Sequence, residues 1–214
     1  MDLANPLSSL IPSLDAVVLE VLAGTEGSLG ASRIHQLGRR GSRQGIVNAL
    51  DRLVEHGLVN AEPTNHGSTY QLNREHVLAP SVLLASAARQ EFFRRLTTAC
   101  GRLSPTPVSV SVFGSVARND STPASDIDLL IVVEHDITDM DAWIDQLYVV
   151  SEQVDAWTGN RLAPITHTIG HLADLIRARE PIVDSWREDA ITIAGTELRT
   201  VLNRSGGNPL DRYR

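Results

Sequence analysis

Apolar and polar positions in the first part of the chain repeat with the period of amphipathic helices. The apolar residues of 14–23 recur at helical spacing and predict a first helix. A second, short helix is predicted over about 32–38, with Ser32 as its cap and with Ile34 and Leu37 on its inward face. The pattern therefore begins with two closely spaced helices.

A third helix follows a glycine-rich turn. Ser42 is expected to cap it, and five apolar residues share one face at i, i+3, i+4 and i+7 spacing: Ile46, Ala49, Leu50, Leu53 and Val54. Alternating runs at 58–59 and 70–72 then predict a hairpin, with a turn at the Asn-His-Gly of 65–67. Three helices and a hairpin, with a short turn between the second and third helices, predict a winged helix-turn-helix over residues 1–75.

A longer helical pattern follows the hairpin. An apolar stripe recurs every four residues from Leu84 to Cys100 and predicts one long connecting helix over 76–103, within a connecting segment of 76–104. Four arginines lie largely outside this stripe: Arg89, Arg94, Arg95 and Arg102. We interpret the stripe as a packing surface, either for the second module or for a twin copy in a homodimer, and the pattern leaves both open.

The pattern then changes to strands. The β-branched run VSVSVF follows Pro105 and Pro107, and a second strand opens at Asp126 and continues as LLIVV. The later elements are expected to be a helix at 139–157, a strand at 161–170, a helix at 171–179, a further helix, a short strand ITIAG and a closing helix. The predicted fold class is α+β: the winged module, the connecting helix, and over 105–203 a mixed β-sheet flanked by helices, with a tail at 204–214.

Composition limits the class of protein. The chain of 214 residues is 42% hydrophobic and 21% charged, which is typical of a globular protein with a proper core. The pattern contains no apolar stretch of membrane-spanning length and no signal peptide at its start, so no membrane partner is expected. Cys100 is the single cysteine, which favours a cytoplasmic location.

Charge is distributed unevenly along the chain. Residues 1–103 hold ten arginines and nine acids, whereas residues 104–214 hold nine arginines and seventeen acids, as if two modules had been joined. Within the first half, no acid separates Glu26 from Asp51, and this interval carries a local basic run of Arg33, Arg39, Arg40 and Arg43. Such a run is where a phosphate backbone is expected to bind.

The third predicted helix carries a resemblance. The segment ALDRLVEHGLV at 49–59 resembles the junction between helix and wing in bacterial winged-helix regulators, and the likeness covers about residues 10–75. The resemblance implies that this helix enters the major groove of DNA. Candidate contacts to phosphates or base edges are Arg39, Arg40, Ser42, Arg43, Gln44 and Asn48. The alternative is a module for protein contacts with a solvated basic face.

Gly45, inside the same helix, would permit close approach of the backbone to DNA or to the second helix.

The most informative chemistry lies where the second strand begins. Asp126 and Asp128 are two residues apart, so their carboxylates share one face of a strand and repel each other unless a cation lies between them. Oxygen ligands of this kind suit Mg²⁺ held by one or two carboxylates together with nucleotide phosphates. Gly114 lets the backbone approach a phosphate, and Ser115 adds a hydroxyl and an amide at the same place.

At these residues the chain resembles the DNA polymerase beta-like nucleotidyltransferase superfamily. The quoted motif is Phe-Gly-Ser at 113–115, ten residues, and then Asp-Ile-Asp-Leu at 126–129, with strands on both sides. The likeness is closest to the small, kanamycin-nucleotidyltransferase-like members and extends over 105–203. It implies transfer of a nucleoside monophosphate from an NTP to a hydroxyl, with two Mg²⁺ ions held by Asp126 and Asp128. Gly114 and Ser115 would then grip the triphosphate, and Arg118 would either reach a phosphate or remain a solvated loop residue.

One departure from that family pattern puts catalysis in doubt. Active members usually add a third carboxylate from a later strand, and the strand predicted at 161–170 contains no acid. The nearby acids are not at the expected place: Glu134, Asp136, Asp155 and Asp174. His167 or a water is a substitute base by hypothesis only. His167 and His171 have a zinc-pair spacing, but a strand end and Gly170 intervene.

Two functions of different classes therefore stay open. The first is an enzyme that transfers a nucleoside monophosphate to an unknown acceptor, with a winged helix that binds DNA. The second is a DNA-binding regulator whose transferase-like domain is a weak or inactive nucleotide sensor. An antitoxin-like pairing of the two modules is a further alternative by analogy.

Overall fold

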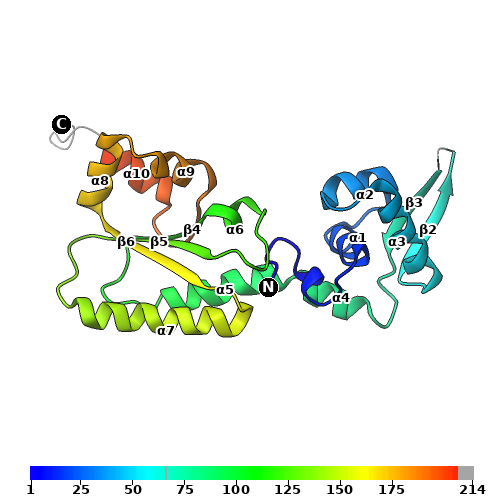
Figure 1. Cartoon of the computed structure of the whole chain (residues 1–214), viewed down its shortest axis with the longest axis horizontal. Helices are drawn as coiled ribbons and strands as arrows, with labels where there is room; N and C mark the ends of the chain where they lie inside the picture. The colour runs from blue at the N-terminus through cyan, green and yellow to red at the C-terminus, as the bar shows by residue number, and fades with distance from the viewer. Residues whose placement is uncertain (66, 207–214) are drawn as a thin grey trace. The chain divides into compact units, whose positions relative to one another are not determined.

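The computed structural model describes residues 1–65 and 67–206, which form two compact units (Figure 1). The N-terminal unit is Asp2–Gln90, and the C-terminal unit is Glu91 onward together with Met1.

The N-terminal unit combines helices with a small sheet. Its elements are η1 (Pro6–Ser9), α1 (Leu14–Ala23), β1 (Leu29–Gly30), α2 (Ala31–Gly38), α3 (Arg43–Glu55), β2 (Val59–Thr64), β3 (Gly67–Leu72) and α4 (Ala79–Ser86). The sheet is antiparallel in the order β1-β3-β2. The helix boundaries predicted for α1 and α3 agree with the structure, and Ser42 caps α3 by accepting a hydrogen bond from the Gly45 amide at 3.1 Å.

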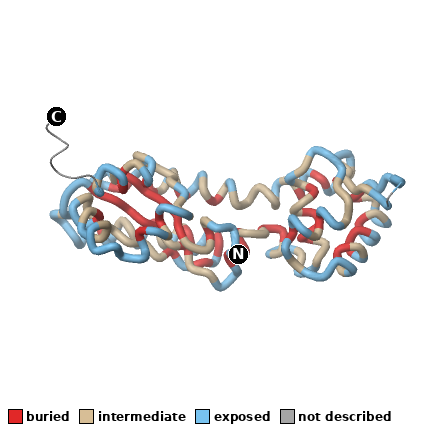
Figure 2. The backbone as a smooth tube through the Cα atoms, turned by 90° about the horizontal axis from the view of Figure 1, so that it is seen from above, coloured by how far each residue is buried: buried red, intermediate tan, exposed pale blue. Residues whose placement is uncertain are grey.

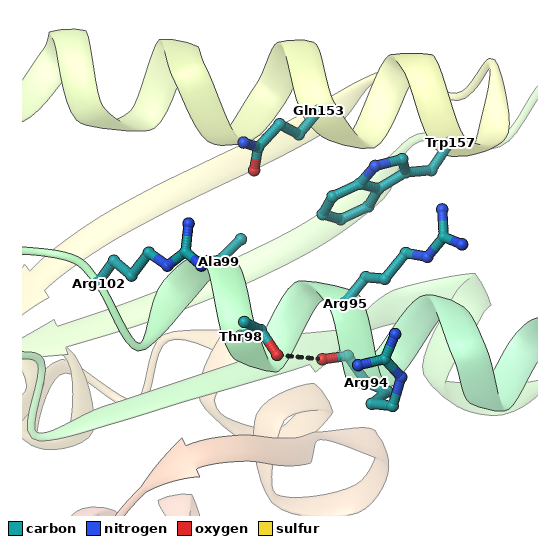
Figure 3. A pocket seen from close by; sticks show the side chains of 7 residues that line it. All are labelled: Arg94, Arg95, Thr98, Ala99, Arg102, Gln153 and Trp157. Atoms are coloured by element: carbon teal, nitrogen blue, oxygen red, sulfur yellow. Dashed lines mark hydrogen bonds between the residues drawn. The ribbon is translucent and has the colours of Figure 1, made fainter.

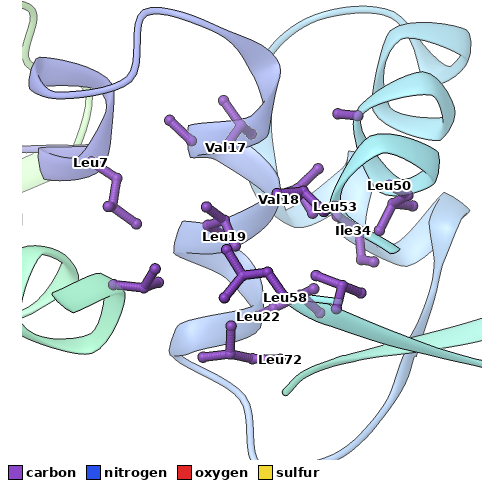
Figure 4. Packing of buried hydrophobic residues seen from close by; sticks show 14 of the residues in the cluster. Leu7, Val17, Val18, Leu19, Leu22, Ile34, Leu50, Leu53, Leu58 and Leu72 are labelled. Carbon is purple, nitrogen blue, oxygen red and sulfur yellow. The ribbon is translucent and has the colours of Figure 1, made fainter. Parts of the chain in front are cut away.

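The core of the N-terminal unit is built around α1 (Figure 4). This helix contacts η1, α2, α3 and α4, so nearly all of its sides are covered, and Val18, Leu19 and Leu22 are at most 1% exposed. A helix that is covered on most sides needs apolar residues around its whole circumference. The almost uninterrupted apolar sequence of 14–23 is therefore explained by its central position.

Two glycines allow other segments to approach α1. A Cβ on Gly45 would lie 2.6 Å from a methyl carbon of Leu14, and a Cβ on Gly41 would lie at the same distance from that side chain. Gly41 also has a φ of +74°, a conformation that favours glycine. Gly45 thus lies against Leu14 of α1, and the expectation that it allows close approach to the second helix is wrong.

Three local predictions in this unit need correction. The second helix begins at Ala31 behind Gly30, without a side-chain cap, so Ser32 is not its cap. Leu37 is 42% exposed, whereas Ile34 is fully buried, because the eight-residue helix turns a narrow face inward. The hairpin strands are longer than the apolar runs suggested, since polar residues pair from Val59 out to Thr64. His66, in the predicted turn, lies outside the described residues.

The predicted connecting helix is two helices. The first, α4, begins at Ala79 because Pro80 is tolerated only in a first helical turn, and it ends before Ala87, where ψ is −2°. The second is α5 (Ala88–Cys100). Leu84 is 78% exposed, so the four-residue stripe is buried only from Phe92 onward. The prediction of one helix over 76–103 is therefore wrong.

The C-terminal unit is built on a mixed sheet. After α5 its elements are β4 (Ser109–Phe113), α6 (Gly114–Arg118), β5 (Ile127–Val133), α7 (Met140–Thr158), β6 (Leu162–Thr168), α8 (Ile169–Ala178), α9 (Pro181–Asp189), β7 (Ile191–Gly195) and α10 (Leu198–Gly206). The strand order is β6-β5-β4-β7, with β5 and β6 parallel and the other pairs antiparallel. The predicted α+β class, with a mixed sheet flanked by helices, is confirmed.

Helices cover both faces of this sheet. In Figure 1, α5 and α7 lie along one face, and α8, α9 and α10 cover the other. Between them, β5 is buried almost throughout, and Figure 2 shows the central strands as continuous buried stretches. A strand covered on both faces reads as an unbroken apolar run, which explains LLIVV. Trp186 of α9 is fully buried against this layer, with its ring edge-on to Phe113.

Two further observations concern the described helices. None of those in residues 1–65 and 67–206 combines the length and the apolar character needed to cross a bilayer. The closing helix α10 continues to Gly206, so residues 204–206 of the predicted tail are helical. The remainder of that predicted tail, 207–214, lies outside the described residues.

Candidate functional site

The Gly-Ser pair and the two aspartates meet at one end of the central strand pair. β4 ends at Phe113, which pairs with Asp128 in the antiparallel ladder, and α6 begins at the next residue, Gly114. The polar segment between α6 and β5 therefore loops out and returns. The predicted motif is brought together by the β4–β5 register.

Gly114 is in direct contact with one of the carboxylates. Its φ is +70°, and a Cβ placed on it would collide with Oδ2 of Asp128. Any other residue would be strained by the backbone and would also displace the carboxylate. The glycine is thus required for Asp128 to lie against the backbone at the start of α6.

The two carboxylates lie in different environments. Burial, and after it the neighbouring charge of Asp126, raises the pKa of Asp128 above its ordinary value, while the Arg118 guanidinium acts in the opposite direction. Asp126 precedes β5, which begins one residue later than predicted, and its side chain is 42% exposed. Its Oδ2 accepts two hydrogen bonds from the Arg161 guanidinium, at 2.7 and 3.2 Å. A guanidinium therefore pairs with the first aspartate.

The β5–β6 register shows what stands beside the aspartates. Asp128 pairs with Ala163, so the nearest side chain on the neighbouring strand is a methyl group. Arg161 lies beside Asp126, and its carbonyl accepts a hydrogen bond from the Ile127 amide at 2.9 Å. Within residues 1–65 and 67–206, no three His, Cys, Asp or Glu side chains form a group that could hold a metal. The described residues thus supply two carboxylates and no third.

Arg118 is engaged by acids on two sides. It donates to Asp120 at 3.2 Å and to Asp189, at the end of α9, at 2.9 Å. These contacts hold the guanidinium close enough to lower the pKa of Asp128. For Arg118 to bind a phosphate, the phosphate would have to replace these carboxylates. Ser115, the second residue of α6, is half-buried.

The histidines lie away from the aspartates. His167 pairs with Val132, four residues along β5 from Asp128, which at ~3.3 Å per residue is about 13 Å away. Burial, followed by the charge of His171, lowers the pKa of His167. The two rings are in edge-on contact, with centroids 4.5 Å apart. His167 is thus too distant to act as the base at Asp128.

The candidate DNA-binding residues gather around the start of α3. Exposed residues among them are Arg39, Ser42, Arg43, Gln44 and Asn48. Gln44 donates to Asn48 at 2.9 Å, and the Ser42 hydroxyl serves as the cap. Arg40 pairs at 2.7 Å with Asp2, whose side chain is only 3% exposed. Arg40 therefore has a structural partner within its own unit.

Sequence reasoning missed three residues that shape the carboxylate site. Arg161 and Asp189 pair with Asp126 and Arg118, and Ala163 stands opposite Asp128. Each is far from its partner in the chain. The register of the parallel pair reveals Arg161 and Ala163, the packing of α9 beside α6 reveals Asp189, and no local pattern marks any of them.

Comparison with known proteins agrees with the geometry. Residues 93–167 match the family model described as a nucleotidyltransferase domain, and this segment contains both the Gly-Ser pair and the two aspartates. It begins within α5 and ends within β6, whereas the resemblance was expected over 105–203. No curated protein matches the chain significantly. The match supports a nucleotidyltransferase domain, with nucleotidyl transfer as its general activity.

Proposed function

We propose that the C-terminal unit binds an NTP with Mg²⁺ at Asp126 and Asp128 and transfers its nucleoside monophosphate to an acceptor hydroxyl. The observation that carries the proposal is the contact between Asp128 and the Gly114 backbone, with Asp126 beside it, inside the segment matched by the family model. A resemblance to the small, kanamycin-nucleotidyltransferase-like members is part of the proposal.

The residues present fit magnesium that arrives with a nucleotide. Mg²⁺ is usually held by one or two carboxylates plus substrate phosphates rather than by a complete protein cage. Asp126 and Asp128 supply such a pair, and the raised pKa of Asp128 indicates a carboxylate that gains from a nearby cation. Bound there, one or two Mg²⁺ ions would neutralise charge on the transferring phosphoryl group.

The chain's own residues have distinct proposed roles. The Gly114 backbone and the Ser115 hydroxyl hold triphosphate oxygens, and Arg118 contributes positive charge. Arg161 occupies Asp126 through two hydrogen bonds, so it must release that carboxylate before a ligand can use it. Because both partners are largely exposed, this release costs little.

Label transfer tests the proposal. Full-length protein with Mg²⁺ and labelled NTP should label one of the acceptor classes offered: protein, RNA or a small hydroxylated molecule. Asp126→Asn and Asp128→Asn should each abolish transfer, whereas Asp174→Asn, an exposed carboxylate on α8, should leave it unchanged. Calorimetry that finds no magnesium-dependent NTP affinity would reject the site.

For the N-terminal unit we propose a winged helix that binds DNA. Three helices with an antiparallel three-stranded sheet, and polar side chains exposed along the start of α3, support this proposal. Arg39→Gln with Arg43→Gln should weaken a salt-sensitive mobility shift, and Arg74→Gln, in the same unit, serves as the matched control. A shift that does not respond to the double substitution would contradict DNA binding through α3.

A second function is favoured by Ala163. Without a third carboxylate beside Asp128, the unit would bind NTP and Mg²⁺ as a sensor and turn over weakly or not at all. A sensor predicts that NTP and Mg²⁺ alter the DNA shift without label transfer. Ala163→Asp should then create transfer where the original chain shows none, while Ala163→Ser, similar in size, should not.

We propose the cytoplasm as the location for either function.

A further inference from the structure

A cleft runs between α5 and α7 within the C-terminal unit (Figure 3). Its volume is about 180 Å³, and one side is lined by Arg94 and Arg95 of α5 and by Arg102, two residues beyond the end of that helix. Gln153 and Trp157 of α7 line the other, and Figure 3 shows the Trp157 ring facing the α5 arginines. The functions proposed above use none of these five residues.

The cleft carries excess positive charge. Glu91 accepts from Arg94 at 2.7 Å and from Arg95 at 2.8 Å, and these hydrogen bonds lower the pKa of Glu91 to about 2. One carboxylate thus faces two guanidinium groups, and Arg102 adds a third cation. From Glu91 onward, the sequence holds eighteen acids and twelve arginines. A basic cleft on so acidic a unit is a specific local feature rather than a general surface property.

An aromatic platform lies among these cations. The Arg95 guanidinium carbon is 5.8 Å from the centre of the Trp157 ring, which is the geometry of a cation–π contact. Trp157 is only partly buried, whereas Trp143 and Trp186 are buried in the core. A partly exposed indole beside arginines is the combination that binds nucleobases and phosphates together.

The cleft continues along the two helices. A second hollow of about 170 Å³ shares Arg102 and Gln153 with the first and extends to Gln146 and Val149. From Gln146 to Trp157, α7 rises about 16 Å. Val149 is 54% exposed and offers an apolar surface along this path. The groove is thus long rather than round, which favours a chain-like ligand over a single anion.

We propose that the α5–α7 groove binds single-stranded nucleic acid. A base stacks on Trp157, a following base lies against Val149, and Arg94 and Arg102 bind the phosphates between them. Gln153 supplies hydrogen bonds to base edges. The proposal stands apart from nucleotidyl transfer, because the groove contains neither aspartate of that site.

Fluorescence anisotropy tests the groove in the full-length protein. The probes are labelled oligothymidylate and oligouridylate of about a dozen nucleotides, in EDTA and without NTP. Arg94→Gln with Arg102→Gln should weaken binding about tenfold or more, and the salt slope should fall by about 0.7 for each phosphate that is no longer neutralised. Trp157→Leu should weaken binding about fivefold or more. Comparison of the two probes shows whether the strand is DNA or RNA.

Matched variants make the result decisive. Arg177, on α8, is exposed and pairs with an acid three residues earlier, as Arg94 does. Arg177→Gln should therefore leave strand binding unchanged. Asp126→Asn should also bind normally, so loss of transfer and loss of strand binding are distinguishable. The proposal is overturned if the double substitution has no larger effect than Arg177→Gln. It is also overturned if Arg39→Gln with Arg43→Gln abolishes binding, or if tripolyphosphate displaces the strand at equal phosphate concentration.

Discussion

Each unit contains an aspartate that pairs with an arginine, but the aspartate is buried in one unit and exposed in the other. In the N-terminal unit, Asp2 is buried, accepts from the amides of Ala4 and Asn5 at 3.0 Å, and pairs with Arg40 at 2.7 Å. In the C-terminal unit, Asp126 meets only an exposed guanidinium. Its neighbour Asp128 is half-buried, and burial together with the charge of Asp126 raises its pKa.

The difference separates an acid that stabilises the fold from the acids that the proposed function uses. A buried carboxylate with several donors stabilises the fold, because each oxygen recovers the hydrogen bonds that it made to water in the unfolded chain. A half-buried carboxylate with a raised pKa is less stable in its charged form than it would be in water, and a nearby cation offsets that cost. The surroundings of the oxygens therefore indicate which acid supports folding and which is available to a ligand.

The largest expected effect is a loss of activity when Gly114, beside Asp128, is replaced. Gly114→Ala should abolish label transfer, or lower magnesium-dependent NTP affinity at least about a hundredfold, because its Cβ would displace Asp128. Gly159→Ala is the matched control: its φ is +68°, but a Cβ there would meet nothing within 4 Å. Each substitution should lower the free energy of unfolding by about 1 kcal/mol. Equal activity losses in both variants would show that backbone strain alone is responsible.

The next largest effect is on stability, and it compares the buried Asp2 with the exposed Asp126. Asp2→Ala removes a buried partner and two amide acceptors, and it should lower the stability of the N-terminal unit by about 2–4 kcal/mol. Asp126→Ala should change stability by less than about 0.5 kcal/mol, because its pair is exposed. Urea unfolding followed by hydrogen exchange in α1 and β5 measures each unit. A similar loss of unfolding free energy in both variants would show that the two aspartates do not differ in their contribution to stability.

A pH-dependent effect arises in the N-terminal unit. Burial raises the pKa of Glu20 to about 7 from 4.5, opposed by the hydrogen bond from the Leu7 amide. The folded unit therefore holds a proton that the unfolded chain releases, so stability falls as pH rises from about 4.5 to 7 and is flat above that range. Glu20→Gln should remove this slope and should be more stable than the original chain at pH 8. Hydrogen exchange of α1 across this pH range is the measurement.

The smallest effect concerns Arg161. Arg161→Gln frees Asp126 from a cation and should raise magnesium affinity about two- to fivefold, with little change in stability. Titration calorimetry with Mg²⁺ and a non-hydrolysable NTP measures it, and Arg177→Gln again serves as the control. Weaker binding in the variant would indicate that Arg161 contacts the nucleotide instead of competing for the carboxylate.

Periodic and strongly apolar segments were predictable from the sequence. The helix with Ile46, Leu50 and Leu53 inward, and the buried run after Asp128, were found because burial of one or both faces dictates their pattern. The Gly-Ser and Asp-x-Asp residues were predicted as a candidate site because strands flank them in the order of the family motif, and the segment that the family model matches contains them. These features are local, so the sequence displays them directly.

Long-range pairing could not be predicted in the same way. The partnership of Arg40 with Asp2, and that of Arg161 with Asp126, depends on how distant segments meet in the fold. The division of the connecting helix at Ala87 was not predicted either, because the four-residue stripe continues through Leu84 although that residue is exposed. Local pattern thus predicted the residue types of the candidate site, and the strand register shows which residues stand beside them.

The buried strand β5 has a consequence for how the carboxylate site can adapt. Asp128 is attached to the stretch of the C-terminal unit that is covered on both faces, where shifts of even a fraction of an ångström meet close-packed neighbours. If the proposed nucleotide site accepts different nucleotides, we expect the adjustment to come from the exposed positions of the 119–125 segment and from the rotamer of Arg161. Attempts to alter nucleotide choice should randomise those positions and keep the strand untouched.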